Sequence, residues 1–250
     1  MNVYIYDDFL NKGKYSKTIN KIEIRLTDLG LNGKIIRLGS IKNARDIIQN
    51  EIKGGARNIT AVGNNRTINK VISSIIDNDF YDVLRDEIIF SLIPVGSEAN
   101  SIAYSLGIKD SEGACNIILA RRIEKITVGE INGNDAYFLN KLEMSSRGTS
   151  LKIDSSYTIE ALERGTIKIV NLPGEEEAKV KGGINPNDEY LDIILGRKIR
   201  EISAIKAKSI SIEHTDGPVI ADESLEIPAA KHIKISRKKI RMIIGKDRKF

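Results

Sequence analysis

Apolar residues in the first half of the chain follow two alternating spacings. Short apolar runs cover residues 3–6, 34–38, 59–62 and 88–94. Between these runs, apolar side chains recur three and four positions apart in residues 16–29, 44–52, 67–76 and 100–106, and a further helical stretch covers residues 111–123. The short apolar runs are typical of buried strands. The spacing of three and four positions is typical of helices with one buried face. We therefore predict an α/β domain over residues 1–122, with a parallel sheet covered by helices on both faces.

The pattern changes after residue 122. Residues 125–130 and 136–142 read as strands on either side of a hairpin turn at residues 131–135. Further short strands are predicted at residues 150–153, 166–170, 191–195, 209–213, 232–235 and 240–244. Residues 173–188 are polar and rich in Gly and Pro, which predicts a loop. Many short strands joined by turns indicate an antiparallel β domain over residues 123–250.

Composition places the chain among ordinary globular proteins. It has 250 residues, 41% hydrophobic and 29% charged, and no run approaches the ~20 apolar residues that span a bilayer. Cys115 is the only cysteine, so no internal disulfide can form, and a cytoplasmic location is expected. Residues 231–250 carry nine Lys or Arg against the single acid Asp247. That run suits either a solvated strand face or contact with an anionic membrane surface.

A sharp polar turn follows the third predicted strand. The strand ends at Gly63, the turn runs through Asn64, Asn65 and Arg66, and Thr67 opens the helix. Such a junction points backbone N–H groups and a helix N-terminus at one place, which favours a bound phosphate. We predict that these residues bind a nucleotide.

A second junction of this kind follows the fourth predicted strand. Gly96 and Ser97 form its turn, and Asn100 precedes the next helix. The hydroxyl of Ser97 suits phosphate binding or helix capping. Carboxyl ends of neighbouring parallel strands meet at one edge of a sheet, so the two turns should lie within a side chain's reach of each other.

These turns resemble the signatures of the diacylglycerol kinase catalytic-domain family of lipid kinases. The family includes bacterial diacylglycerol kinases and sphingosine-type kinases, and it is distantly related to NAD kinases. Its Gly-Gly-Asp-Gly-Thr corresponds to residues 63–67, and its Ile-Pro-Leu-Gly-Thr to residues 93–97, with Leu-Gly-Ile at residues 106–108 closing the next helix. The second signature favours the lipid kinases over the NAD kinases.

The resemblance implies a Rossmann-like three-layer N-terminal domain and an antiparallel β-sandwich C-terminal domain. It implies an ATP-dependent lipid kinase that phosphorylates a lipid hydroxyl, such as that of diacylglycerol, at the membrane surface. ATP and Mg²⁺ are the implied cofactors. The resemblance leaves open whether the chain forms a homodimer. With 5% aromatic residues and no Trp, no nucleic-acid partner is expected.

The resemblance also points to two acids near the end of the chain. The family carries Asp-Gly-Glu shortly before a Pro and the last strands, and Asp222, Glu223 and Ser224 stand here before Pro228. The missing Gly leaves either acid as the implied catalytic carboxylate that deprotonates the lipid hydroxyl. The alternative is that both acids lie in an ordinary strand connection.

Four departures from the family pattern affect the nucleotide side. Asn65 replaces an Asp, Arg66 a Gly and Lys70 a Glu, and Asp7-Asp8 follows the first strand where the family has a Gly-rich loop. A neutral amide offers Mg²⁺ no anionic oxygen and cannot act as a base. Arg66 either blocks the phosphate site or binds phosphate with its guanidinium. The alternative function is therefore a catalytically degenerate, non-enzymatic nucleotide- or lipid-binding protein with the same fold.

No protein metal site is predicted. His214 and His232 are the only histidines, and no Cys or His lies at metal-ligand spacing. Both histidines are expected at the surface.

Overall fold

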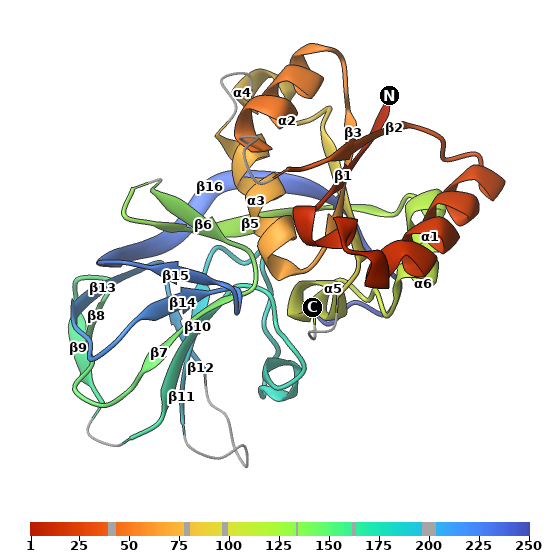
Figure 1. Cartoon of the computed structure of the whole chain (residues 1–250). Coiled ribbons are helices and arrows are strands. Elements are labelled where there is room, and N and C mark those ends of the chain that lie inside the picture. The colour runs from red at the N-terminus through yellow and green to blue at the C-terminus, as the bar shows by residue number, and fades with distance from the viewer. Residues whose placement is uncertain (40–43, 78–80, 97–99, 134, 162–163, 197–203) are drawn as a thin grey trace. The chain divides into compact units, whose positions relative to one another are not determined.

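The alternating pattern of the first half and the strand-rich second half correspond to two structural units in the computed structural model (Figure 1). The structure describes residues 1–39, 44–77, 81–96, 100–133, 135–161, 164–196 and 204–250. The first unit comprises residues 1–125 and 240–248, and the second comprises residues 126–239 and 249–250. The segment at residues 240–248 thus returns to the first unit.

A parallel sheet forms the centre of the first unit. Its strands lie in the order β2 (Lys34–Arg37), β1 (Asn2–Tyr6), β3 (Asn58–Gly63), β4 (Ile89–Pro94) and the C-terminal part of β16 (His232–Ile243). β1, β3 and β4 are buried along almost their whole length, as expected for strands covered on both faces. β2 lies at the edge and is largely exposed.

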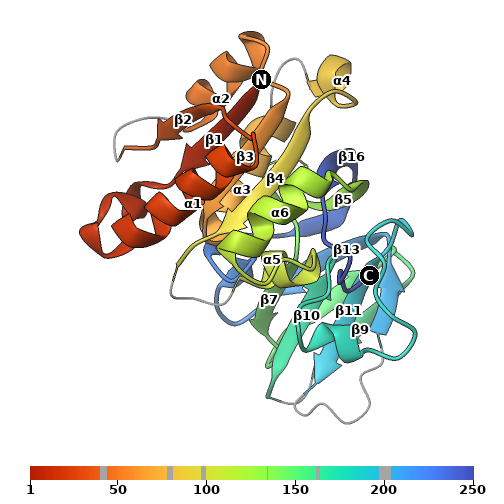
Figure 2. The same cartoon turned by 90° about the vertical axis from the view of Figure 1, so that its right-hand side faces the viewer.

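Helices cover both faces of this sheet. They are α1 (Ser16–Asp28), α2 (Ala44–Lys53), α3 (Asn65–Ile76), α4 (Tyr81–Leu84), α5 (Ser101–Ser105) and α6 (Ser111–Ala120), with 3₁₀ turns η1 (Asp8–Asn11) and η2 (Gly13–Tyr15). α1 packs beside α6 and α2 beside α3, and Figure 2 shows the first pair over one face of the sheet. The predicted three-layer α/β architecture is confirmed. Among the described residues, no helix is long and apolar enough to cross a bilayer.

The second unit is built from antiparallel strands. One sheet has the order β12 (Ala204–Ala207), β11 (Leu191–Gly196), β10 (Thr166–Val170), β7 (Lys141–Ser145), β14 (Val219–Ala221) and β15 (Leu225–Ile227). The other contains the N-terminal part of β16, β13 (Ser209–His214), β8 (Ser150–Ile153), β9 (Tyr157–Glu160), β5 (Ile123–Ile131) and β6 (Ala136–Phe138). Apolar side chains from both sheets, among them Leu142, Leu151 and Ile210, form one core. This arrangement confirms the predicted antiparallel sandwich.

The polar segment at residues 173–188 forms a loop with one 3₁₀ turn, η3 (Glu177–Lys179). It has a small core of its own, because Val180 and Ile184 pack on Val170 and Ile194. The loop therefore covers the face of β10 and β11 that points away from the main core.

Candidate active site

The first turn is a strand–turn–helix junction, as its sequence predicts. β3 ends at Gly63, and the side chain of Asn64 caps α3 by accepting a hydrogen bond from the Thr67 N–H at 3.2 Å. A Cβ at position 63 would collide with the Thr67 hydroxyl, so only glycine fits there. The N–H groups of Asn65 and Arg66, in the first turn of α3, lie beyond the reach of intrahelical acceptors.

The second turn lies directly beside the first. Gly63 pairs with Pro94 in the parallel register of β3 and β4, and the Val95 N–H donates to the Gly63 carbonyl at 3.0 Å. Across the turns, the Asn65 side-chain amide donates to the Ser101 hydroxyl at 3.1 Å. The two turns are therefore in contact, as predicted from the parallel sheet.

Two of the three predicted site residues in the second turn lie within the described part of the chain. Gly96 is exposed, with φ at 149°. Asn100 caps α5 by accepting a hydrogen bond from the Ala103 N–H at 2.8 Å. Ser97 lies outside the described residues, so its predicted contact with phosphate stays a prediction.

An acid from β1 joins the first turn. Asp7 follows β1 directly, and its Oδ2 accepts a hydrogen bond from the Thr67 hydroxyl at 2.7 Å, while its Oδ1 accepts one from the Phe9 N–H at 3.4 Å. Thr67 is fully buried. The hydroxyl that we predicted to hold phosphate is thus engaged by a carboxylate. The sequence analysis did not predict the contact between Asp7 and Thr67. Its only sign in the sequence is the position of Asp7 directly after a predicted strand.

Asp222 is a buried anchor in the turn between β14 and β15. Its carboxylate accepts hydrogen bonds from three backbone N–H groups, those of Leu139 at 2.8 Å, Asn140 at 2.7 Å and Lys141 at 2.9 Å. The residue has no exposed surface. Because its oxygens are bound by backbone donors, Asp222 holds residues 139–141 in place and is poorly placed to meet a substrate.

Glu223 differs from its neighbour in both exposure and backbone conformation. About a third of its side chain is exposed (34%), and its Oε1 lies 3.3 Å from the ammonium of Lys141. Its φ of 62° is in the left-handed region that glycine tolerates best. Of the two acids, Glu223 is the one that solvent and a ligand can reach.

A buried charge cluster on the same sheet was not predicted from the sequence. Glu177 has only 2% of its side chain exposed, and its Oε1 accepts hydrogen bonds from the ammonium groups of Lys168 at 2.6 Å and Lys141 at 3.3 Å. Burial alone would raise the pKa of Glu177, but the Lys168 hydrogen bond and the charge of Lys141 hold it below its usual value. The sequence predicts only a polar loop at residues 173–188, and its run of three acids does not reveal which acid is buried.

Comparisons with known proteins show the family and the fold of this chain. The family described as "Diacylglycerol kinase catalytic domain" matches residues 3–131. This chain belongs to that family. The fold resembles a crystal structure of a diacylglycerol kinase from Bacillus anthracis, with a TM-score of 0.76, 17% identity and coverage of 98% of this chain and 97% of that one. It also resembles an NAD kinase from Archaeoglobus fulgidus in complex with ATP, with a TM-score of 0.58, 14% identity and coverage of 99% and 95%. The curated proteins contain no match.

The residues that depart from the pattern of the diacylglycerol kinase family take up distinct positions. Asn65 is buried and tied to Ser101, whereas Arg66 and Lys70 are exposed on α3. Arg66 therefore does not fill a buried site in this structure. The Gly of the family's Asp-Gly-Glu element corresponds to Glu223 in this chain. Glu223 has a backbone conformation that is typical of glycine, although it is not a glycine.

Mg²⁺ does not fit the described residues of the first turn. The Asn65 amide faces Ser101 as a donor, and both oxygens of the nearby Asp7 accept hydrogen bonds from the protein. Mg²⁺ prefers carboxylate oxygens and water in an open octahedral shell. Within the described ranges, no group of three or more His, Cys, Asp or Glu residues is arranged to hold a metal ion.

Proposed function

We propose that this chain is an ATP-dependent kinase that phosphorylates a lipid hydroxyl such as that of diacylglycerol. Membership of the diacylglycerol kinase family supports the reaction class, and the likeness to an ATP-bound NAD kinase supports a nucleotide ligand. The observation that carries the proposal is the contact between the two turns through Asn65 and Ser101. It brings two helix N-termini to the carboxyl edge of the sheet, where nucleotides bind in open α/β folds.

We assign the binding of ATP phosphates to the first turn of α3 and to Arg66. The backbone N–H groups of Asn65 and Arg66 are donors at a helix N-terminus, where an anion is favoured. The exposed guanidinium of Arg66 can donate two parallel hydrogen bonds to phosphate. Since the site residues do not fit Mg²⁺, these cationic and N–H groups would neutralise the phosphate charge.

We assign the proton-accepting role to Glu223. A general base must reach the hydroxyl it deprotonates, and the exposure of Glu223 allows this where the burial of Asp222 does not. Asp222 would instead fix the turn that carries Glu223.

The second candidate function is nucleotide or lipid binding without catalysis. It is favoured by the Thr67 hydroxyl, which donates to Asp7, and by the neutral Asn65 in place of a carboxylate. Phosphoryl transfer depends on positioning and on neutralisation of phosphate charge, and both changes alter that environment.

An assay with labelled ATP distinguishes the two candidate functions, with a panel of lipids in mixed micelles and NAD as the acceptors. The proposed kinase transfers label to at least one lipid, and Glu223→Gln lowers the rate about 10²–10⁴-fold, as expected for the loss of a general base. Glu226→Gln removes an exposed acid from the neighbouring strand β15 and should leave the rate unchanged. ATP binding without transfer to any lipid would favour the non-catalytic function, and transfer to NAD alone would contradict both.

A further inference from the structure

The turn between β14 and β15 has a backbone conformation that its residues rarely adopt. Asp222 and Glu223 have φ angles of 45° and 62°, both in the left-handed region. Successive non-glycine residues keep such a conformation only where the surrounding structure fixes it. Part of that fixation is reciprocal: the Asp222 N–H donates to the Lys141 carbonyl at 2.8 Å, and the Lys141 N–H donates to the Asp222 carboxylate at 2.9 Å.

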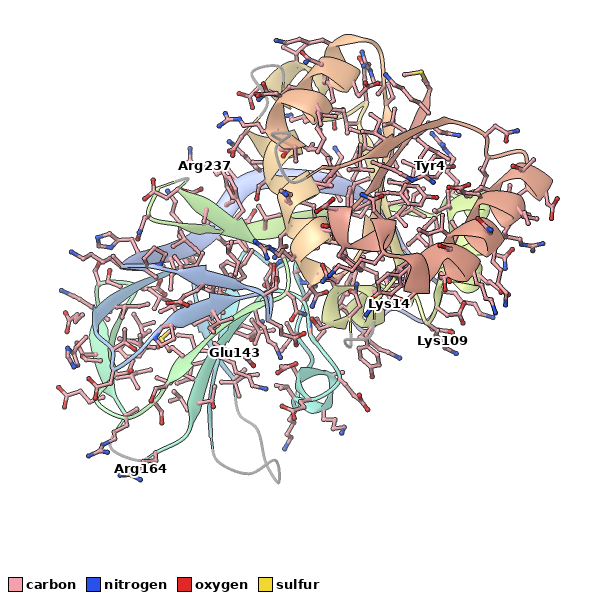
Figure 3. The ribbon with its side chains drawn as sticks, viewed as in Figure 1. Tyr4, Lys14, Lys109, Glu143, Arg164 and Arg237 are labelled. Carbon is pink, nitrogen blue, oxygen red and sulfur yellow. The ribbon has the colours of Figure 1, made fainter. Side chains whose placement is uncertain are left out.

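The side chain of Lys141 contacts the same turn. Only 8% of it is exposed, and its ammonium lies 3.2 Å from Glu143, 3.3 Å from Glu177 and 3.3 Å from Glu223. Glu143 comes from the same strand, β7 (Figure 3). An ammonium has three N–H donors, and three carboxylates surround this one. Lysine is almost never buried unless it is paired in this way.

Glu177 brings a second segment to this ammonium. It belongs to η3, in the loop that packs on β10 and β11, and its Oε1 also accepts from Lys168 at 2.6 Å. Lys168 in turn pairs with Glu176 at 2.6 Å and with Glu143 at 3.6 Å. The charged groups that face the Lys141 ammonium therefore come from β7, β10, η3 and the β14–β15 turn.

We propose that Lys141 is a positioning residue that couples the loop at residues 173–180 to the carboxylate of Glu223. The inference rests on the proposed function, because Glu223 is the acid to which that function assigns proton transfer. Glu177, in the loop, holds the Lys141 ammonium in place. The same ammonium holds the carboxylate of Glu223, in the turn between β14 and β15. A displacement of the loop therefore changes the position of the acid, although the two are about forty-five residues apart in sequence.

Hydrogen exchange of the full chain, followed by mass spectrometry, tests the coupling without any need for activity. The substituted side chain of Glu177→Gln lies in the loop, yet we expect exchange to rise about tenfold more in residues 173–180 and at the Asp222 and Ser224 N–H groups than elsewhere in the second unit, the order expected for loss of a charge-assisted hydrogen bond. Faster exchange in the loop alone would overturn the proposal.

Substitution of the lysine itself separates charge from packing. Lys141→Met keeps a long apolar stem without the charge and should raise exchange in both segments, whereas Lys141→Arg keeps the charge and should restore protection. Lys206→Met is the matched control, because Lys206 lies on β12, at the opposite end of the sheet from the turn, and pairs with Asp188 and with Asp192 of β11. Equal protection in the wild type and Lys141→Met would also overturn the proposal.

A kinetic measurement then distinguishes this inference from the proposed function. If the wild type transfers phosphate, Glu177→Gln and Lys141→Met should lower kcat with KM for ATP unchanged, and Lys141→Arg should recover kcat. A fall in kcat with Lys206→Met as well would indicate a general loss of structure and contradict a positioning role. If the wild type transfers no phosphate, the proposed function fails, and the exchange data still decide whether the coupling exists.

Discussion

The side-chain amide of Asn65 donates a hydrogen bond to the hydroxyl of Ser101, and this bond joins the two turns at the carboxyl edge of the parallel sheet. The family pattern has a carboxylate at position 65. In this chain the residue at that position is a neutral hydrogen-bond donor that links the two turns. It leaves Arg66, one residue further along the helix, as the exposed charged group of the turn.

Asp222→Asn should destabilise the second unit. The carboxylate accepts three backbone hydrogen bonds, and an amide offers only one acceptor oxygen while its NH₂ group faces a buried N–H. A buried donor without a partner costs about 1–3 kcal/mol. We expect the free energy of unfolding in urea to fall by about that amount. Asp216→Asn, an exposed acid in the preceding connection, should have little effect, and equal stability of Asp222→Asn and wild type would contradict the anchoring role.

Glu223→Gly should separate stability from activity. The left-handed backbone at this position costs glycine less than glutamate, so relief of strain offsets both the entropy cost of glycine and the loss of the partly exposed ion pair with Lys141, which keeps two other carboxylate partners. We expect the free energy of unfolding to stay the same or to rise by up to about 1 kcal/mol, with loss of transfer to lipid. Thermal unfolding and the labelled-ATP assay check this prediction. A variant that is stable and fully active would show that Glu223 is not the proton acceptor.

The sequence supports much of this fold because local patterns determine it. The parallel sheet could be predicted because buried strands alternate with amphipathic helices. The meeting of the two junctions could be predicted because polar turns follow both β3 and β4. The hairpin-rich second half specified antiparallel sheets in the same way.

Other features depend on contacts between segments that are distant in sequence. The bond from Thr67 to Asp7 requires β1 and β3 to be neighbours, and the burial of Glu177 depends on how its loop packs on β10. The sequence predicts residues 240–244 as one more strand of the β domain. In the structure, however, Arg241 and Met242 pair with β4 in the parallel sheet of the first unit. Hydrophobic spacing cannot indicate such partners, because it reports which face is buried and not what covers it.

Stability should depend on pH through Glu177. Burial opposes its charged form, but the hydrogen bond from Lys168 and the charge of Lys141 outweigh burial, so its folded-state pKa is lowered. A lowered pKa adds stability above the unfolded value of about 4.3, and that stability is lost as pH falls through the folded value. Glu177→Gln should therefore lose on the order of 3 kcal/mol at neutral pH, as expected when one partner of a buried ion pair is removed.

Urea unfolding at several pH values measures this effect. The difference between wild type and Glu177→Gln should be constant near neutral pH and shrink below about pH 4. Glu175→Gln, an exposed neighbour, is the control. A gap that widens in acid would contradict the lowered pKa.

Membrane binding should be weak and electrostatic. Several basic residues near the end of the chain already have partners, such as Lys234 with Glu130 and Arg248 with Glu124. Two other basic residues are exposed: Arg237 on β16, which Figure 3 labels, and Lys231, which directly precedes that strand. Each cation near an anionic surface contributes about 1 kcal/mol. Binding to phosphatidylserine liposomes should fall with salt and about fivefold for each of Arg237→Gln and Lys231→Gln, whereas binding that is insensitive to salt would contradict this mode of attachment.

The central claim is that Arg66 and the N-terminus of α3 hold the phosphates of ATP without a carboxylate-bound metal. Calorimetric titration of ATP into the wild type and Arg66→Gly, each with Mg²⁺ and with chelator, tests it most directly, and Arg66→Ala separates loss of the guanidinium from the added flexibility of glycine. We predict similar ATP binding by the wild type with and without Mg²⁺, and binding weaker by about 1.5–3 kcal/mol for both variants. Tighter binding by Arg66→Gly, or wild-type binding that requires Mg²⁺, would contradict the account.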